Sequence, residues 1–327
     1  MLSICIPVYN FDVRALVQDL HEQAARCDVP FEIILMDDAS DVSYADCLQS
    51  LAVLSDVRVI ALTENIGRSK IRNALVKKAR YPYIIFMDCD SATASNDYIA
   101  QYLPLCQPNT VVYGGRRYEQ KKPSDATLLH WKYGVKRESL PATERQKHPN
   151  FSFCTNNFLI DKEIFNIITF SEQLQGYGHE DTFFGLELLG HHIPVVHLDN
   201  PLIHLGLETS DVFLKKTENG IVNLHKVELL LREKYPDYVG HSKLMRTKIR
   251  LQKWHLLTLT RGFLRIFKPL LKRNLLGKHP SLFVFDLYKL NELLNAEKRE
   301  ATSKVASPNT MKNFTIRKKQ NCQPSQV

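Results

Sequence analysis

The feature that most constrains the fold is a regular alternation of short apolar runs and amphipathic stretches over the first 115 residues. Four runs are typical of buried strands, namely LSICIPVY (2–9), FEIILMDD (31–38), VRVIALTEN (57–65) and YPYIIFMDCD (81–90). The stretches between them carry apolar residues at helical spacing. Near-continuous Ile, Val and Leu runs separated by helices indicate a mostly parallel sheet covered on both faces. We therefore predict an α/β fold whose parallel sheet is flanked by helices, with loops at the carboxyl ends of the strands.

The pattern changes after residue 115 and divides the chain into four parts. Residues 1–115 and 116–210 are predicted to be the two halves of one domain, and 119–150 within the second half has the polar, basic composition of a mobile loop or a loop with one helix. Residues 211–300 are predicted to form a helical extension. Residues 301–327 are polar and without periodicity, and we expect a disordered tail.

The formal charge of +8 is concentrated in one segment. Residues 243–278 contain eleven Lys or Arg and no Asp or Glu, so the remaining chain carries a net charge of −3. This distribution does not favour a nucleic-acid partner. On a helical wheel, residues 245–272 form one helix with two faces. The basic face holds Arg246, Arg250, Lys253, Arg261, Arg265, Lys268 and Lys272, and the apolar face holds Met245, Ile249, Leu256, Leu259, Phe263, Ile266, Phe267 and Leu270.

Two hypotheses account for this segment. It lies in the interface of an anionic membrane, or its apolar face packs on the domain and its basic face is in water. The chain begins without the features of a signal peptide and has no run of 18 apolar residues. Its seven cysteines are scattered singly, which favours a reducing compartment. We expect a cytoplasmic protein, which the first of the two hypotheses would make peripheral on the inner face of the cytoplasmic membrane.

Carboxylates follow the fourth apolar run, where Asp88 and Asp90 flank Cys89. In open parallel sheets, ligands bind outside the carboxyl ends of the strands. Two carboxylates at such an end can hold Mg²⁺ or Mn²⁺, or they can cap a turn. We expect Cys89 to point into the core, because a thiol is a soft ligand that suits Mg²⁺ poorly.

A second acidic pair, Glu180 and Asp181, precedes an apolar helical run. The pair can complement the helix dipole, or one member can act as a general base. His204 follows a predicted strand and is either a structural histidine or a functional one.

These motifs occur in a specific order. SICIPVYN, MDDAS, ENIGRSKIRN, FMDCD, TNN and GYGHEDTFF follow one another along residues 1–210. Their order and spacing resemble the inverting, nucleotide-sugar-dependent family-2 glycosyltransferases of the GT-A fold, among them bacterial cell-surface polysaccharide transferases. The resemblance implies a GT-A-type, Rossmann-like fold with a mixed, mostly parallel sheet flanked by helices and followed by a C-terminal helical extension. It also implies that residues 1–115 bind the nucleotide-sugar and that residues 116–210 bind the acceptor and carry the catalytic residues.

The resemblance also implies roles for individual residues. Asp181 would be the catalytic base, with Glu180, Asn156 and Asn157 contacting the acceptor or sugar. Asp90 and His204 would hold Mn²⁺ or Mg²⁺. The nucleotide-binding residues would be Pro7, Tyr9, Asn10, Asp38, Asn65, Arg72 and Asp88.

The implied activity is transfer of a hexosyl or N-acetylhexosaminyl group from a nucleotide diphosphate donor, UDP-sugar by preference, to a hydroxyl of a glycan or lipid-linked acceptor. Direct displacement would invert the anomeric configuration. Two alternatives remain open: a phosphatase of the haloacid dehalogenase type, with Asp88 as nucleophile, and a non-catalytic scaffold that binds sugar nucleotide at a membrane surface. The phosphatase motif is expected near the start of its fold, whereas three predicted strands precede Asp88.

Overall fold

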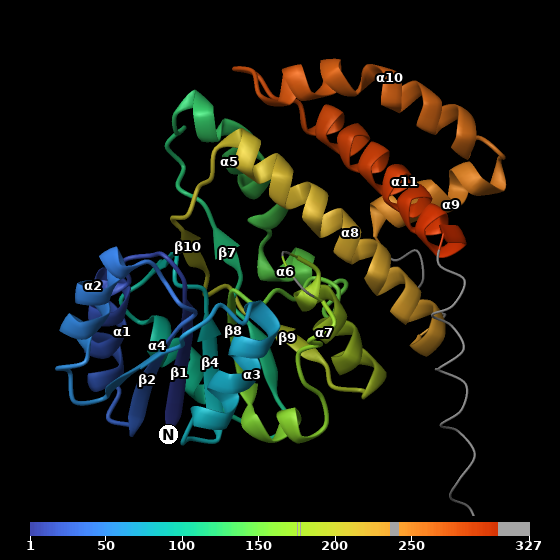
Figure 1. Ribbon diagram of the computed structural model, residues 1–327. Helices are drawn as coiled ribbons and strands as arrows, with labels where there is room; N and C mark the ends of the chain where they lie inside the picture. Colours follow the sequence, from blue (N-terminus) through green and yellow to red (C-terminus); the bar gives the residue numbers. More distant parts are fainter. Residues whose placement is uncertain (175, 177, 236–241, 307–327) are drawn as a thin grey trace, which may run out of the picture.

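A computed structural model describes residues 1–174, 176, 178–235 and 242–306. Its main sheet has the strand order β3-β2-β1-β4-β8-β6-β9 (Figure 1). β1 pairs in parallel with β2 and β4, and β8 is antiparallel to both of its neighbours. The predicted mixed, mostly parallel sheet is therefore confirmed. The strands are β1 (Leu2–Val8), β2 (Phe31–Asp37), β3 (Val57–Ala61), β4 (Tyr83–Met87), β6 (Val111–Tyr113), β8 (Asn157–Asp161) and β9 (Val195–His197).

Helices cover both faces of this sheet, as predicted. Alternate strand residues point to opposite faces, so Ile4 and Ile6 belong to one hydrophobic cluster and Cys5 belongs to the other. The first face is covered by α1 (Arg14–Ala25), α2 (Ala45–Leu51) and α4 (Tyr98–Tyr102). The second is covered by α3 (Arg68–Lys78) and α7 (Glu180–Gly190).

A small second sheet lies beyond the carboxyl ends of the main strands. It has the order β5-β10-β7, from β5 (Ser91–Thr93), β10 (Leu202–His204) and β7 (Arg116–Arg117). The antiparallel register pairs Ser91 with His204, and the parallel register pairs Leu202 with Arg116. This sheet joins three segments that are distant in the sequence.

The region 119–150 is not a mobile loop, which corrects the first of the two expectations for it. It contains α5 (Leu128–Tyr133), a π-helical turn over Gly134–Glu138, and α6 (Ala142–Arg145). Two anchors hold it. Leu129 is buried in a cluster with Phe213, and the buried guanidinium of Arg145 donates to the carbonyls of Tyr113 and Leu198.

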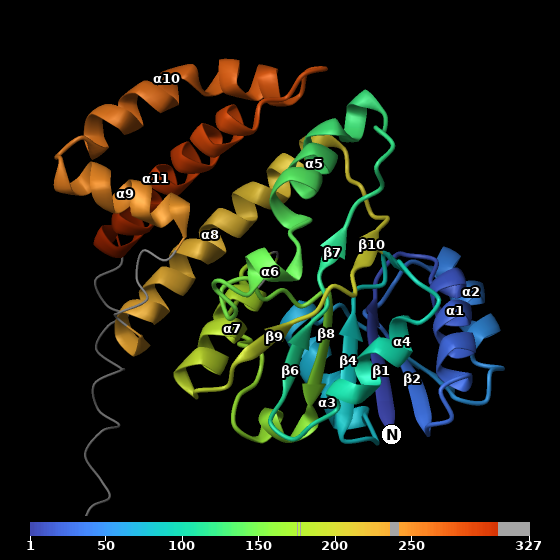
Figure 2. The ribbon, with the colours of Figure 1, turned by 180° about the vertical axis from the view of Figure 1, so that it is seen from behind.

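The C-terminal part consists of α8 (Ser210–Lys234), α9 (Lys243–Lys253), α10 (Leu257–Leu275) and α11 (Leu282–Ala306). Figures 1 and 2 show α11 between α8 and α10, with α10 at the outer edge of the molecule. None of the described helices is long and apolar enough to cross a bilayer.

Two expectations for this part are wrong. Residues 245–272 are not one helix, because α9 ends at Lys253 and His255 adopts a left-handed φ of 56° before α10 begins. The expected tail also begins too early, since α11 continues through residues 301–306. The rest of that tail, 307–327, lies outside the described residues.

Asn157, the first residue of β8, is a structural hub of the domain. Its side chain is fully buried, and its Oδ1 accepts hydrogen bonds from the hydroxyls of Tyr98 (2.6 Å) and Tyr102 (2.7 Å). Its Nδ2 donates to the carbonyls of Gly115 (2.8 Å) and Asn200 (2.9 Å). The amide thereby ties α4 to β8 and to the turn before β7.

We expect Asn157→Ala to lower the free energy of unfolding by about 2–4 kcal/mol, because it leaves buried hydroxyl and carbonyl groups without partners. Urea unfolding followed by circular dichroism measures this loss. Asn166→Ala is the matched control, since Asn166 is exposed and its amide donates only to Glu163 among the described hydrogen bonds. Equal losses for the two variants would contradict the structural role of Asn157.

Candidate active site

The carboxylate of Asp88, just after β4, is fixed between two guanidinium groups. Its Oδ1 accepts from Arg72 at 2.8 Å, and its Oδ2 lies 3.4 Å from Arg116. Arg72 comes from α3 and is only 2% exposed, and Arg116 comes from β7. The two cations stabilise a carboxylate at the rim of the sheet. Arg72 was predicted to approach a nucleotide; its guanidinium is buried and donates to Asp88.

Asp90 faces His204 across the small sheet. The Oδ1 of Asp90 and the Nδ1 of His204 are 3.5 Å apart, and the backbone carbonyl of Asp90 accepts from the amide of Leu205. Burial alone would raise the pKa of Asp90. The imidazole of His204 and the more distant Arg116 and Arg68 outweigh burial and hold this pKa at about 2. Asp90 is therefore ionised at neutral pH.

The Asp90–His204 pair fits a divalent cation. The Oδ1 of Asp90 and both ring nitrogens of His204 are buried, and none has a hydrogen-bond partner within the described structure. Buried polar atoms are normally satisfied. The Oδ1 of Asp90 and the Nδ1 of His204 face each other at 3.5 Å, the long limit of a hydrogen bond, and a cation shared by the two residues would satisfy them better. The carboxylate oxygen suits both Mn²⁺ and Mg²⁺, whereas an imidazole nitrogen is a borderline donor that the transition metal Mn²⁺ accepts more readily than Mg²⁺. In the described part of the chain no group of three or more His, Cys, Asp or Glu is placed to hold a metal ion, so further ligands would have to come from substrate or water.

The surroundings of His204 include residues that sequence analysis missed. The ring of Tyr118 packs edge-on against His204 at 5.2 Å, and the ring of His130 lies 5.4 Å away. The Tyr118 hydroxyl donates to Glu138, which also pairs with Arg116 at 3.2 Å. Burial lowers the pKa of His130 to about 4, so this ring is neutral. The local sequence signal near these residues is the Gly114-Gly115 pair, which is typical of a turn, just before β7.

The acidic pair at the start of α7 has opposite pKa shifts. Burial disfavours the charged form of both residues. Arg68 at 3.4 Å and Arg72 at 3.9 Å overcome this for Glu180 and lower its pKa. For Asp181, burial and the negative charge of Glu180 raise the pKa to about 6, although the backbone amide of Thr182 donates to its carboxylate. Opposite pKa shifts of two neighbouring carboxylates are typical of acid–base sites.

The residues predicted to bind a nucleotide follow β1, β2 and β3. Pro7 lies within β1, and Tyr9 beyond it is 51% exposed. Asn10 exchanges two hydrogen bonds with Asp41, and Asn65 is exposed. These contacts hold the loops on the same rim as Asp88.

Asp38 is buried and accepts from the amides of Ile66 and Gly67. This carboxylate shapes the turn that starts α3, and two of its acceptor positions are used for that purpose.

Asn156 and Asn157, expected to act alike, have different environments. The Oδ1 of Asn156 accepts from the hydroxyl of Tyr113, and its buried Nδ2 has no partner among the described residues. Asn157 is buried with its amide fully bonded inside the protein, which is the placement of a structural residue.

Cys89, between the two aspartates, packs against the cluster on the α1 face, as expected. Burial raises its thiol pKa to about 12, so it remains neutral.

Gly206 sets the distance between the loop after β10 and Asp90. A Cβ at this position would lie 2.3 Å from Oδ2 of Asp90 and 3.0 Å from its Cβ. We therefore expect Gly206→Ala to displace the Asp90 carboxylate and to weaken Mn²⁺ binding at least tenfold, as measured by electron paramagnetic resonance titration.

Gly262→Ala is the control, because a Cβ there meets nothing within 4 Å and lies in an exposed helix. It should leave Mn²⁺ binding unchanged and stabilise α10 slightly. Unaltered Mn²⁺ affinity of Gly206→Ala would contradict the role given to this close approach.

Comparison with known proteins adds a family match over half of the chain. Residues 3–168 match the model of Glycosyl transferase family 2. The uncharacterized glycosyltransferase YfnE of Bacillus subtilis (strain 168) is 23% identical over 240 residues, which are 67% of this chain and 61% of that protein. Chondroitin synthase of Pasteurella multocida (strain Pm70) is 24% identical over 224 residues, which are 57% of this chain and 23% of that protein. The chain thus spans less than two thirds of the length of either relative.

Among solved structures, the mannosyltransferase PcManGT from Pyrobaculum calidifontis, in complex with GDP-Man and Mn²⁺, is similar with a TM-score of 0.55. Its identity is 13%, and the match covers 94% of this chain and 87% of that chain. At this identity the likeness establishes the fold, an α/β GT-A-like fold followed here by the helices α8 to α11.

Proposed function

Because the chain belongs to glycosyl transferase family 2, we propose that it transfers a sugar from a nucleotide diphosphate donor to an acceptor hydroxyl. One observation carries this proposal. The buried guanidinium of Arg72 lies 2.8 Å from Asp88 and 3.9 Å from Glu180, so it joins Asp88 after β4 to the residue that precedes Asp181 at the start of α7. A donor-binding carboxylate and a candidate general base are thereby held at one rim.

The donor occupies the loops after β1 to β4 in this proposal. Tyr9, Asn10 and Asn65 border the nucleotide, with Pro7 and Asp38 shaping the loops beneath it, and Asp88 contacts the ribose or sugar. Arg72 orients Asp88 from behind. The family resemblance favours a UDP-sugar with a hexosyl or N-acetylhexosaminyl group.

Asp90 and His204 would hold Mn²⁺ or Mg²⁺ through the Oδ1 of the carboxylate and one ring nitrogen of the imidazole. The bound cation would neutralise charge that develops on the diphosphate leaving group. Tyr118 and His130 fix the orientation of the His204 ring, and Gly206 allows Asp90 to approach it.

Asp181 is the proposed general base. An acceptor hydroxyl has a pKa far above 7, so its proton must move to a carboxylate as its oxygen bonds to the anomeric carbon and the nucleoside diphosphate leaves. Attack opposite the leaving group inverts the configuration. The acceptor is proposed to be a glycan or lipid-linked glycan of surface polysaccharide biosynthesis, contacted by Glu180 and by the free Nδ2 of Asn156.

A donor panel tests the proposal. With UDP- and GDP-sugars and Mn²⁺, we expect slow release of one nucleoside diphosphate by donor hydrolysis. Asp90→Asn and His204→Gln should reduce this release by about 10²–10³, the range seen when one charge-stabilising group is lost. Nucleotide release is measured by anion-exchange chromatography.

Asp46→Asn is the control for these variants, since Asp46 is exposed on α2. Donor binding without turnover would support a scaffold instead. Hydrolysis of p-nitrophenyl phosphate in the absence of any donor turnover would support a phosphatase.

The pH dependence tests the base. Because burial and Glu180 raise the pKa of Asp181 to about 6, this carboxylate is protonated below that pH and active above it. We expect kcat/KM for donor hydrolysis, followed by nucleotide release at a series of pH values, to fall about tenfold per pH unit below pH 6 and to level off above pH 7.

Glu180→Gln should move this inflection to lower pH, because it removes a neighbouring negative charge. Asp181→Asn should retain donor binding while its turnover is low and flat with pH. Full activity of wild-type protein at pH 5 would rule out Asp181 as the base.

A further inference from the structure

An apolar ridge runs along the outward face of α10. It consists of Leu259, Phe263, Ile266, Phe267 and Leu270, whose spacing of four, three, one and three places them on one helical face. Their exposed fractions are 71%, 57%, 75%, 38% and 59%. A monomeric protein rarely leaves such a contiguous row uncovered without a partner.

The ridge is not the face by which α10 attaches to the molecule. Leu264 of α10 packs with Leu290 and Leu294 of α11, and Leu275 packs in the cluster around Phe285. Basic side chains also point inward, since Lys268 pairs with Glu292 at 2.8 Å and Lys272 lies 3.6 Å from Asp211. The expectation that the apolar face packs on the domain is therefore wrong for these five residues.

Exposed positive charges lie on α10 and at both of its ends. Arg265 and Arg273 are exposed on α10, while Lys253 and Lys278 are exposed just before and after it. The whole segment 243–278 lacks acidic residues. An apolar row among cations is complementary to a surface that is apolar inside and anionic outside.

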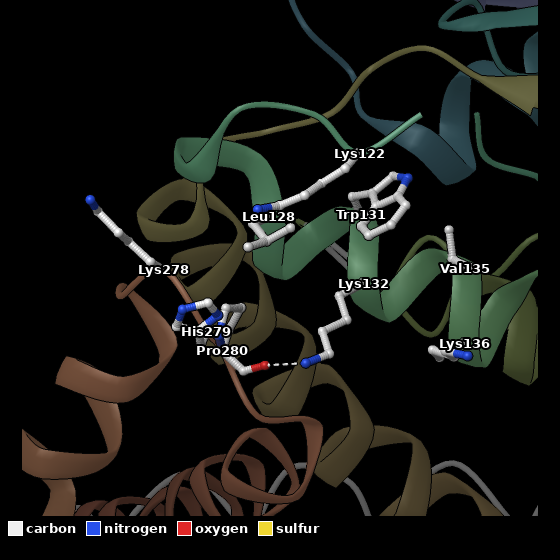
Figure 3. Close-up of a pocket in the computed structure, with 9 residues that line it drawn as sticks. All are labelled: Lys122, Leu128, Trp131, Lys132, Val135, Lys136, Lys278, His279 and Pro280. Atoms are coloured by element: carbon white, nitrogen blue, oxygen red, sulfur yellow. Dashed lines mark hydrogen bonds between the residues drawn. The ribbon is translucent and has the colours of Figure 1, made fainter. Parts of the chain in front are cut away.

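Both tryptophans of the chain lie at the ends of α10. Trp254 is 62% exposed just before the helix. Trp131 of α5 lines a cavity of about 250 Å³ beside residues 278–280 (Figure 3). The cavity is also lined by Lys122, Lys132, Lys136, Lys278 and His279. The ammonium of Lys132 donates to the carbonyl of Pro280 (Figure 3), and that of Lys122 lies 3.4 Å from Asp125, so Lys136 and Lys278 are the candidate lysines for a phosphate. Tryptophan is enriched at membrane–water interfaces, and lysines suit phosphate.

We propose that the ridge on α10 docks on an anionic lipid membrane. α10 lies in the plane of the interface with the ridge below the headgroups, and the lysine-lined cavity at its end takes a headgroup phosphate. The ridge and the charges support docking by themselves, whether or not the proposed sugar transfer is correct.

Co-sedimentation of the full chain with vesicles tests docking. Vesicles of phosphatidylcholine with phosphatidylglycerol should bind the protein at least tenfold more tightly than phosphatidylcholine alone, and salt should weaken this binding. The double variant Phe263→Asn/Ile266→Asn should lose at least tenfold in affinity, because it removes two large apolar side chains from the interface. Lys136→Gln/Lys278→Gln should lose about tenfold on anionic vesicles and little on neutral ones.

Val42→Asn/Val53→Asn is the matched control, since these valines are 89% and 82% exposed far from α10. It should bind vesicles as the wild type does. Donor hydrolysis by the ridge variant should be unchanged in the absence of vesicles, which separates docking from the active site.

Three outcomes would overturn the proposal: no vesicle binding, equal binding to neutral and anionic vesicles, or binding that survives the ridge variant. A wild-type dimer that becomes monomeric in the ridge variant, without vesicle binding, would instead make the ridge a contact between two copies of the chain. Unchanged affinity of the lysine variant would remove the cavity from the proposal.

Discussion

The site depends on the pairing of carboxylates with two arginines, the buried Arg72 and the half-buried Arg116. Asp88, Asp90, Glu138 and Glu180 all lie on one rim, and removing carboxylates from water costs several kcal/mol each unless they are compensated. Arg72 sits beneath Asp88 and Glu180, and Arg116 lies between Asp88 and Glu138. Without these two guanidinium groups, the negatively charged carboxylates of the rim would repel one another. Asp181 does not share in this compensation to the same extent, which is why its pKa rises while that of Glu180 falls.

The small sheet brings together side chains that the main sheet does not. Its register places Ser91 opposite His204 and Leu202 opposite Arg116, so a single set of strand pairings assembles Asp90, His204 and Arg116. Each of these strands has only two or three residues. Stability of the arrangement must therefore come from its surroundings, such as the Asn157 amide below it and the packing of Tyr118 beside it.

The elements predicted correctly from the sequence are those that a periodic pattern of apolar residues marks. The strands β1 to β4, the helices between them and the acidic pairs were found, because apolar runs mark the strands and carboxylates follow or precede those runs. Arg116, Tyr118, His130 and Glu138 were missed, because β7 has two residues and the segment after it looks like a polar loop. Asn157 was grouped with Asn156 by motif, yet only the tertiary contacts of the two amides separate a structural residue from one with a free donor.

α10 illustrates a limit of another kind. The helical wheel identified its two faces, but periodicity cannot say which face meets the rest of the protein. Here leucines on a third side and two lysines attach the helix, and the apolar ridge is left outside. α10 lies beyond the carboxyl ends of the main strands in both views (Figures 1 and 2). A membrane that covers the ridge would therefore lie on the same side of the sheet as Asp181, where a lipid-linked acceptor would have to arrive.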